Sequence, residues 1–495
     1  MNPRLAPRAQ VSLGVATQRA RDGGRELPSS VDLLHTLVEE GDPVAVAVLN
    51  ASGIDPAMLV ARSGALAELE PGPDPLAAAG LEATRRGQML VSAEHLLLGM
   101  LAQPRDPVAL ALAEQVGDLR PLRGQIWRTM LDNSPGGRWE PAGSGMPWSQ
   151  VAESVGCLRA VTSTLPAQRR AAVERTLDGV LREEPIVGLA ACLIEEGRLV
   201  HTGFRGFADL ESAQAFDAST LFRAGSVTKL LTAVAVLQLQ ERALIDLDEP
   251  AARYLRSFTL PDPSVTVLDL LIHTSGLPTG HGLRHYRGPL PTIAEQYARD
   301  ENPTERRGRW RYSNYGYAAL GLLIEDVTGE PLPAYLDQHV LTPLGMTASR
   351  CDASVPALAR AVGYAIDRGK VVPVRETAVV TAGAGFLWSS VRDLACFVSA
   401  VLDGGAGAHG RILTAETLAT MTRPWMTTAM PRLAQGLGFL LWSTPTGTTA
   451  AGHTGDVPGH HCIALADLQR GSGAVVAANT DTGLLTNLAL DLLTS

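Results

Sequence analysis

Lysine is almost missing from this chain. Of its 42 basic residues only two are lysines, Lys229 and Lys370, so nearly every cation is an arginine. Arginine stays protonated in proteins, whereas a lysine in apolar surroundings can lose its proton. A lysine inside an apolar stretch of such a chain is therefore a candidate for proton transfer.

Cysteine, phosphate-binding loops and long apolar runs are also scarce. The five cysteines are scattered, odd in number and lack C-x-x-C spacing, which argues against a disulfide framework and a zinc site. No G-x-x-x-x-G-K-[ST] loop is present to hold nucleotide phosphates. No apolar run approaches membrane-spanning length. We therefore expect neither a metal nor an organic cofactor, and no membrane partner.

Charge and length limit the kinds of partner and the number of domains that we expect. A net charge of −9 argues against nucleic acid as a partner. A hydrophobic content of 45% is typical of well-packed domains, and 495 residues suggest about three units. Residues 1–17 are too short and too interrupted to form a signal-peptide core, so we expect a cytoplasmic protein.

The N-terminal quarter of the chain repeats itself. Residues 24–34 match residues 87–97, and residues 42–45 recur as residues 106–109. Both copies carry apolar residues at helical spacing, with a proline near the start of the following helix. Two copies of one helical unit can stack into a common core. The repeat predicts an all-α domain over residues 1–132.

A second globular unit, residues 166–495, is predicted after a linker over residues 133–165 that is rich in Gly, Pro and Ser. Strands are expected at both ends of this unit, with helices between them. The expected strands are 187–194, 198–204, 437–443, 448–453, 460–466 and 474–479, and the expected flanking helices are 166–182 and 484–493. This order predicts an α+β domain with one antiparallel sheet closed by both ends and a large helical subdomain beside it.

The stretch 223–230 is the most informative, because it leads into an apolar run without Gly or Pro. Ser226 falls in the first turn of the predicted helix, and Lys229 lies one turn further on the same face. Burial favours a neutral amine, which can take the proton of Ser226 and make it a nucleophile. The alternative is a surface lysine beside a helix-capping serine.

A tyrosine-rich stretch could supply the next groups. Tyr312 and Asn314 lie just before a predicted helix. A tyrosine near a lysine can lose or relay a proton, and an amide can both donate to and accept from a substrate. The alternative is an aromatic cluster that packs against the core.

The third stretch, His453, Thr454 and Gly455, ends a predicted strand. Gly455 would let a substrate backbone approach closely. The N–H of Asp456 could then face the N–H of Ser226 as an oxyanion hole. Taken alone, His453 would more often be structural.

The three stretches together resemble the serine β-lactamase and penicillin-binding protein superfamily, especially its class C and esterase branch. The motifs SxxK, YxN and K/H-[ST]-G match at residues 226–229, 312–314 and 453–455. Supporting matches are 273–277, 329–331, 343–346, 383–386 and 390–393. The resemblance covers residues 166–495 and implies a β-lactamase/transpeptidase-like fold.

The same resemblance assigns roles. Ser226 would be the acylated nucleophile, with Lys229 and Tyr312 as its proton-transfer partners. Asn314 would orient the substrate. His453, Thr454 and Gly455 would line the substrate site.

The N-terminal repeat resembles the double-repeat N-terminal domain of Clp chaperone ATPases, through residues 94–98 of its second copy. In the first copy, residues 31–35 match only in part. The resemblance implies a protein or peptide partner. The alternative is a helical domain used for packing or dimerisation.

One departure shifts the expected substrate. β-Lactamases of this branch place a lysine where this chain has His453, and a histidine gives little charge at neutral pH. We therefore expect a small-molecule or peptide ester or amide substrate, with an esterase or amidase/peptidase activity. A biosynthetic transacylase and a catalytically silent peptide-binding protein are the alternatives.

The stretch 306–311 holds four arginines around a tryptophan, directly before Tyr312. At a cleft mouth it would steer anionic substrates. The alternative is a solvated loop whose arginines pair with neighbouring acidic residues.

Overall fold

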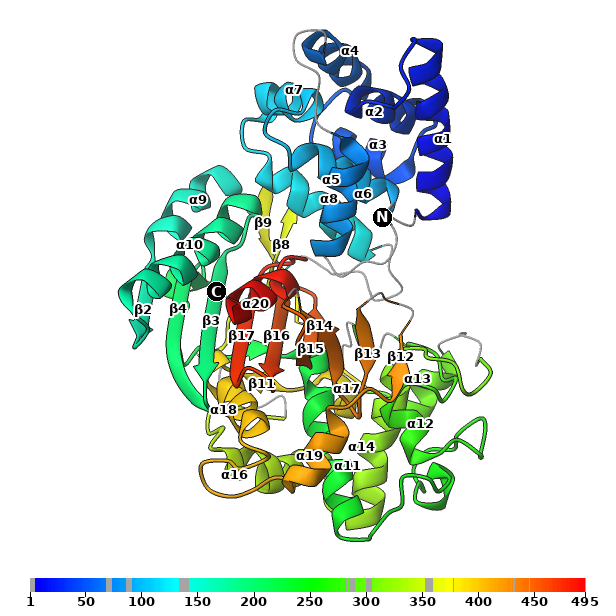
Figure 1. The fold of residues 1–495 in the computed structure, drawn as a ribbon, viewed down its shortest axis with the longest axis vertical. Coiled ribbons are helices and arrows are strands. Elements are labelled where there is room, and N and C mark those ends of the chain that lie inside the picture. Colours follow the sequence, from blue (N-terminus) through cyan, green and yellow to red (C-terminus); the bar gives the residue numbers. More distant parts are fainter. Residues whose placement is uncertain are drawn as a thin grey trace.

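The computed structural model shows a group of helices beside a larger region of helices and strands (Figure 1). It describes residues 5–67, 74–85, 91–132, 142–280, 283–284, 290–299, 305–351, 359–376, 378–428, 430, 432–444 and 446–494.

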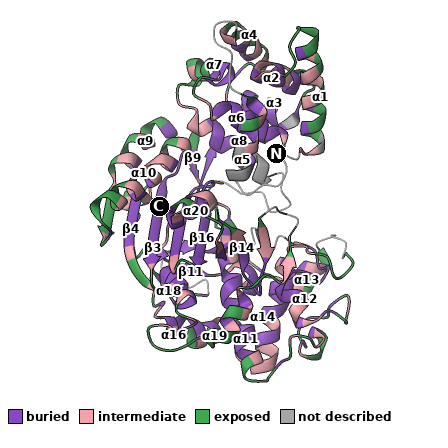
Figure 2. Ribbon diagram, viewed as in Figure 1, coloured by how far each residue is buried: buried purple, intermediate pink, exposed green. Residues whose placement is uncertain are grey.

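Helices build the described part of the N-terminal unit. They are α1 (Pro7–Asp22), α2 (Ser30–Glu39), α3 (Pro43–Ala51), α4 (Pro56–Ala67), α5 (Pro75–Arg85), α6 (Ala93–Leu101), α7 (Pro107–Val116) and α8 (Arg120–Asp132). Their buried leucines, valines and alanines form a hydrophobic core of their own (Figure 2). The helices agree with the predicted all-α unit, whereas its kinship with Clp domains stays a prediction.

The two copies of the sequence repeat begin their helices with the same kinds of N-terminal cap. Ser29 before α2 and Ser92 before α6 each belong to a capping box. Asp42 before α3 and Asp106 before α7 each accept backbone N–H groups, and a proline follows each. Such caps stabilise a helix by about 1 kcal/mol, because they satisfy N–H groups that the helix leaves unpaired. Matching caps therefore place matching helices in both halves.

An antiparallel ten-stranded sheet forms the centre of the second unit. Its main path runs β12-β13-β14-β15-β16-β17-β3-β4-β2, and β5 pairs with β4. The strands are β2 (Arg159–Ser163), β3 (Gly188–Glu195), β4 (Arg198–Asp209), β5 (Gln214–Ala215), β12 (Met426–Thr427), β13 (Leu433–Gln435), β14 (Leu440–Ser443), β15 (Thr449–Val457), β16 (His460–Asp467) and β17 (Ser472–Ala478). Because β17 pairs with β3, the two ends of the unit meet in one sheet, which confirms the predicted α+β architecture.

Helices cover both faces of this sheet. On one face lie α10 (Ala167–Glu183) and α20 (Leu485–Thr494). The other face carries the larger core, α18 (Val391–Leu402) and the helical subdomain. Further helices of the described residues are η1 (Gly225–Val227), α11 (Thr228–Glu241), η2 (Ala251–Arg253), α12 (Val267–Leu271), α13 (Ile293–Arg299), α14 (Asn314–Thr328), α15 (Leu332–Leu336), η3 (Asp337–Leu341), α16 (Thr342–Leu344), α17 (Ala382–Gly385) and α19 (Ala415–Met421).

Short strands complete the unit outside the large sheet. β6 (Phe222–Arg223) pairs with β11 (Trp388–Ser389), and β7 (Leu283–Arg284) with β10 (Ala378–Val379). A third small sheet joins β1 (Met146–Pro147), β9 (Lys370–Pro373) and β8 (Tyr364–Asp367).

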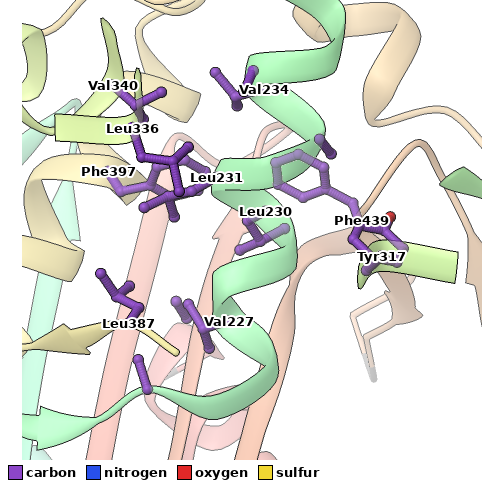
Figure 3. Packing of buried hydrophobic residues seen from close by; sticks show 14 of the residues in the cluster. Val227, Leu230, Leu231, Val234, Tyr317, Leu336, Val340, Leu387, Phe397 and Phe439 are labelled. Atoms are coloured by element: carbon purple, nitrogen blue, oxygen red, sulfur yellow. The ribbon is translucent and has the colours of Figure 1, made fainter. Parts of the chain in front are cut away.

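Helix α11 is buried all round, which is why its lysine lies in apolar surroundings. Every residue from 228 to 239 is buried. Figure 3 shows Leu230, Leu231 and Val234 of this helix among aromatic side chains that include Phe397 and Phe439. A helix that is apolar on every side belongs in a protein core.

The predicted linker is only partly described. Residues 133–141 lie outside the described residues, whereas β1, α9 (Trp148–Cys157) and β2 all lie within residues 146–163. Helix α8 also contacts the second unit directly, because Arg120 donates to the carbonyl oxygen of Leu181 at 3.1 Å, and a Cβ on Gly124 would lie only 3.1 Å from Pro185.

Among the described residues no single helix combines the length and apolar character needed to cross a membrane. One bent pair of helices, Val44–Ala51 and Pro56–Ala67, passes that test together, with an angle of 96° between them.

Candidate active site

Ser226 and Lys229 meet where the chain enters the buried helix. Ser226 lies in the turn η1, and Lys229 follows in the first turn of α11. The Lys229 Nζ lies 2.9 Å from the Ser226 Oγ, as the three-residue spacing predicts. Gly225, at φ +49°, adopts a left-handed conformation that favours glycine and turns the chain into the helix. The serine itself is half-buried, so a substrate can reach it.

The Lys229 amine has three neighbours and no exposed surface. Besides Ser226, it lies 2.8 Å from the Asn314 Oδ1 and 2.8 Å from the carbonyl oxygen of Ala384. Burial lowers the pKa of Lys229 well below its usual value of 10.5. A neutral amine has two N–H donors and one lone pair. The two amide-type oxygens take the donors, so the lone pair is left for the Ser226 hydroxyl.

Tyr312 reaches the same serine from the loop before α14. Its hydroxyl donates to the Ser226 Oγ at 2.8 Å, and its ring lies 4.8 Å from the Lys229 Nζ. Burial raises the pKa of Tyr312 above its usual value of 10. The phenol is therefore protonated before the reaction begins. Of the two roles that the sequence left open for Tyr312, losing a proton or relaying one, this favours relaying.

Asn314 begins α14 and links two other parts of the site. Its Oδ1 accepts from Lys229, and its Nδ2 donates to the carbonyl oxygen of Gly280 at 2.9 Å. Its backbone N–H also donates to the carbonyl oxygen of Thr279 at 2.9 Å. The side chain thus fixes the lysine, and one amide hydrogen remains for a substrate.

The residues predicted to form an oxyanion hole, Ser226 and Asp456, lie on neighbouring backbone segments. A Cβ on Gly225 would lie 2.9 Å from the backbone nitrogen of Asp456. A Cβ on Gly455 would lie 1.9 Å from the carbonyl oxygen of Ala224. Glycine is therefore required on both sides, and the absence of side chains brings the Ser226 and Asp456 segments together.

His453 and Thr454 lie on β15, one on each face of the strand. The ring of His453 is 6.0 Å from the ring of Tyr312, and its Nδ1 lies 2.6 Å from the carbonyl oxygen of Thr454. Burial, reinforced by the nearby Lys229, lowers the pKa of His453 to about 3. His453 is thus a neutral wall of the site, and Thr454 is half-buried beside it.

His273 is a further site residue to which the sequence analysis gave no role. Its ring lies 4.6 Å from that of Tyr312 and 5.1 Å from that of Tyr317. Its Nδ1 accepts from the backbone N–H of Ser313 at 3.1 Å, and its carbonyl oxygen accepts from Arg311 at 2.8 Å. The motif at 273–277 was visible as a family match, but only the fold shows that it supports Tyr312.

The two variants His273→Asn and His273→Gly should separate this contact from backbone strain. His273 has φ +61°, a value that both Asn and Gly tolerate. Only Asn offers an acceptor near the position of Nδ1, so it should retain most of kcat, whereas Gly should lose about 10- to 100-fold through misplacement of Tyr312. Turnover of a p-nitrophenyl ester measures both. Equal activity of the two variants would show that the Ser313 contact is dispensable.

Known proteins resemble the part of the chain that holds these residues. Residues 173–492 match the protein-family model described as Beta-lactamase. The chain is 34% identical over 202 residues to Esterase EstB of Burkholderia gladioli, a match covering 36% of this chain and 51% of the esterase. It is 30% identical over 219 residues to the putative penicillin-binding protein PbpX of Bacillus subtilis (strain 168), covering 43% of this chain and 54% of that protein. The chain therefore spans about half the length of these curated relatives.

A solved structure is similar over a larger share of the chain. The D-amino acid amidase of Ochrobactrum anthropi SV3, complexed with L-phenylalanine amide, is similar with a TM-score of 0.56 and 25% sequence identity. The match covers 66% of this chain and 98% of the amidase. The family match includes all the site residues described above and none of the helices α1 to α8.

Proposed function

Because the chain belongs to the Beta-lactamase family of serine acyl hydrolases, we propose that Ser226 forms an acyl-enzyme with an ester or amide and passes the acyl group to water. The observation that carries this proposal is the arrangement around Lys229. When the amine is neutral, its two N–H groups can bond the oxygens of Asn314 and Ala384, which leaves its lone pair for the Ser226 Oγ, 2.9 Å away. That arrangement suits a general base.

Acylation would move one proton from the serine to the leaving group. Lys229 takes the hydroxyl proton as the Ser226 Oγ attacks the carbonyl carbon. The N–H groups of Ser226 and Asp456 hold the oxyanion. Tyr312 then donates its proton to the leaving alcohol or amine and recovers one from Lys229. Deacylation runs the same path in reverse, with water in the place of the leaving group.

Neutral His453 favours an ordinary ester or amide over a β-lactam drug. It provides no positive charge for the carboxylate that those drugs carry. The similarity to proteins named an esterase and an amidase supports an ester or amide substrate.

Two alternative functions would use the same residues. A transacylase would pass the same acyl group to an amine or alcohol. A binding protein would hold a peptide in the cleft without turnover. Recruitment of a protein or peptide by the N-terminal unit, the linker over residues 133–165 and a cytoplasmic location stay predictions.

The test is labelling of wild-type protein and Ser226→Ala with a fluorophosphonate probe, followed by a panel of p-nitrophenyl esters, D- and L-amino acid p-nitroanilides and a chromogenic cephalosporin. We expect labelling that depends on Ser226, together with turnover of an ester or anilide. Added amine that diverts the product would favour the transacylase. Absence of labelling and turnover in folded protein would favour the binding protein.

The pH profile should identify the base. The active amine is neutral, so kcat/KM should fall as the pH drops through the lowered pKa of Lys229, well below pH 10.5. The raised pKa of Tyr312 means that this residue should cause no alkaline loss below about pH 10. The variant Tyr312→Phe should lose about 100-fold in kcat but keep the acid limb at the same pH. Loss of that limb in Tyr312→Phe would assign the base to Tyr312 instead.

A further inference from the structure

Strand β15 carries a negative charge, Asp456, three residues beyond His453, the position at which β-lactamases of this branch have a lysine. Asp456, whose N–H serves the proposed oxyanion hole, has a side chain that is 61% exposed. Its backbone lies beside the serine turn, because a Cβ on Gly225 would be 2.9 Å from the Asp456 nitrogen. Burial is the main cause of the raised pKa of Tyr312 and of the lowered pKa of His453; the Asp456 charge adds to the first shift and partly offsets the second, so the carboxylate lies within electrostatic range of the site.

A buried histidine holds this carboxylate in place. The Nδ1 of His461 lies 2.6 Å from the Asp456 Oδ1, and its Nε2 lies 3.1 Å from the Asp481 Oδ1. Burial alone would lower the pKa of His461, but hydrogen bonds and charges of the two carboxylates raise it to about 10. Two carboxylates and one imidazolium leave one net negative charge. Asp456 is the exposed member of the three.

The ring of His453, on the same strand, is a second group with an acceptor to which no donor of the described residues is bonded. The Nδ1 of His453 lies 2.6 Å from the carbonyl oxygen of Thr454, so the ring carries its proton there and leaves Nε2 as an acceptor. Within the described residues, that Nε2 is buried and has no hydrogen-bond partner. Buried acceptors without a partner are costly, so this one is suited to a bound N–H group.

Two of the four arginines before Tyr312 are held by other groups. Arg307 pairs with Asp269 at 2.5 Å and donates to the carbonyl oxygen of Ser264 at 2.7 Å. Arg311 lies 3.4 Å from Glu305. Pairing with acidic residues is the alternative that the sequence left open for this stretch, and it weakens the case for anion steering by these two arginines.

We infer that Asp456 selects acyl groups bearing a protonated amine and rejects those bearing a carboxylate. This inference rests on the proposed acyl-enzyme function and deepens it by naming a substrate class. An ammonium group on the Asp456 side of the strand would find its carboxylate, and an N–H group on the opposite side would find the acceptor of His453. A carboxylate on the Asp456 side would meet a like charge without a compensating donor.

The test uses three p-nitrophenyl esters of equal chain length, whose acyl groups end in an ammonium, a methyl or a carboxylate group. In the wild type, kcat/KM should decrease in that order, by about 10-fold or more between the two charged esters. Asp456→Asn keeps the backbone N–H and an acceptor for His461 but removes the charge. It should bring the ratio between the charged esters close to one, and 0.5 M NaCl should reduce the wild-type ratio in the same direction.

Asp467→Asn is the matched control. It makes the same charge change at the far end of the β15–β16 pairing, about 20 Å away, and should leave the ratio unchanged. A ratio is insensitive to the amount of folded protein, so partial unfolding of either variant does not obscure the result. A wild-type preference for the carboxylate ester, or an unchanged ratio in Asp456→Asn, would overturn the inference. Failure of the uncharged fluorophosphonate to label Ser226 would instead overturn the proposed function.

Discussion

Lys229→Met is expected to lower kcat by about 100- to 10,000-fold, because the variant has no lone pair to take the serine proton. Methionine fills a similar apolar space, so helix α11 should keep its place in the core. The rate of labelling by a fluorophosphonate should fall by a similar factor, since the probe reacts with the same oxygen. Stopped-flow turnover and labelling of the purified variant, checked by circular dichroism, measure both.

Lys229→Arg separates a base from a cation. Arginine retains a positive charge and donors for Asn314 and Ala384, but it cannot be deprotonated in a protein. If Lys229 acts as the base, the arginine variant should be as impaired as the methionine variant. Substantial activity in a folded arginine variant would mean that the site needs only a positive charge there.

Gly455→Ala is expected to have the second-largest effect, an activity loss of about 100-fold or more. The new Cβ would lie 1.9 Å from the carbonyl oxygen and 2.8 Å from the carbonyl carbon of Ala224. Strand β15 must then move away from the serine turn, which separates the two oxyanion N–H groups. Because both contacts are with backbone atoms, the strain has no side chain to absorb it, and the free energy of unfolding should fall by about 1–3 kcal/mol.

The control is Gly156→Ala in helix α9. No atom lies within 4 Å of a Cβ built there, and the residue does not need a positive φ. Alanine should leave activity unchanged and stabilise the helix by about 0.5–1 kcal/mol. Measurement of kcat and thermal unfolding for both variants tests the difference. A Gly455→Ala enzyme with normal kcat would show that β15 does not form the oxyanion hole.

The sequence by itself determined the elements whose causes are local. The strands at both ends of the second unit follow from alternating or continuous apolar runs, and β3, β4, β15, β16 and β17 lie close to their predicted ranges. Helix α10 lies at Ala167–Glu183, where a helix was predicted over 166–182. The Ser226–Lys229 contact follows from helical periodicity alone, because residues three apart share a face.

Only the tertiary structure decided how distant segments complete the site. Asn314 and Ala384 reach Lys229 across 85 and 155 residues, so no local pattern could show that they occupy its two donors. The support of Tyr312 by His273, and of Asp456 by His461, likewise depends on packing between separate elements. Local residue types specify which groups are present. Burial and the directions of hydrogen bonds, which exist only once the chain is packed, specify which group holds the proton and which charge faces the substrate.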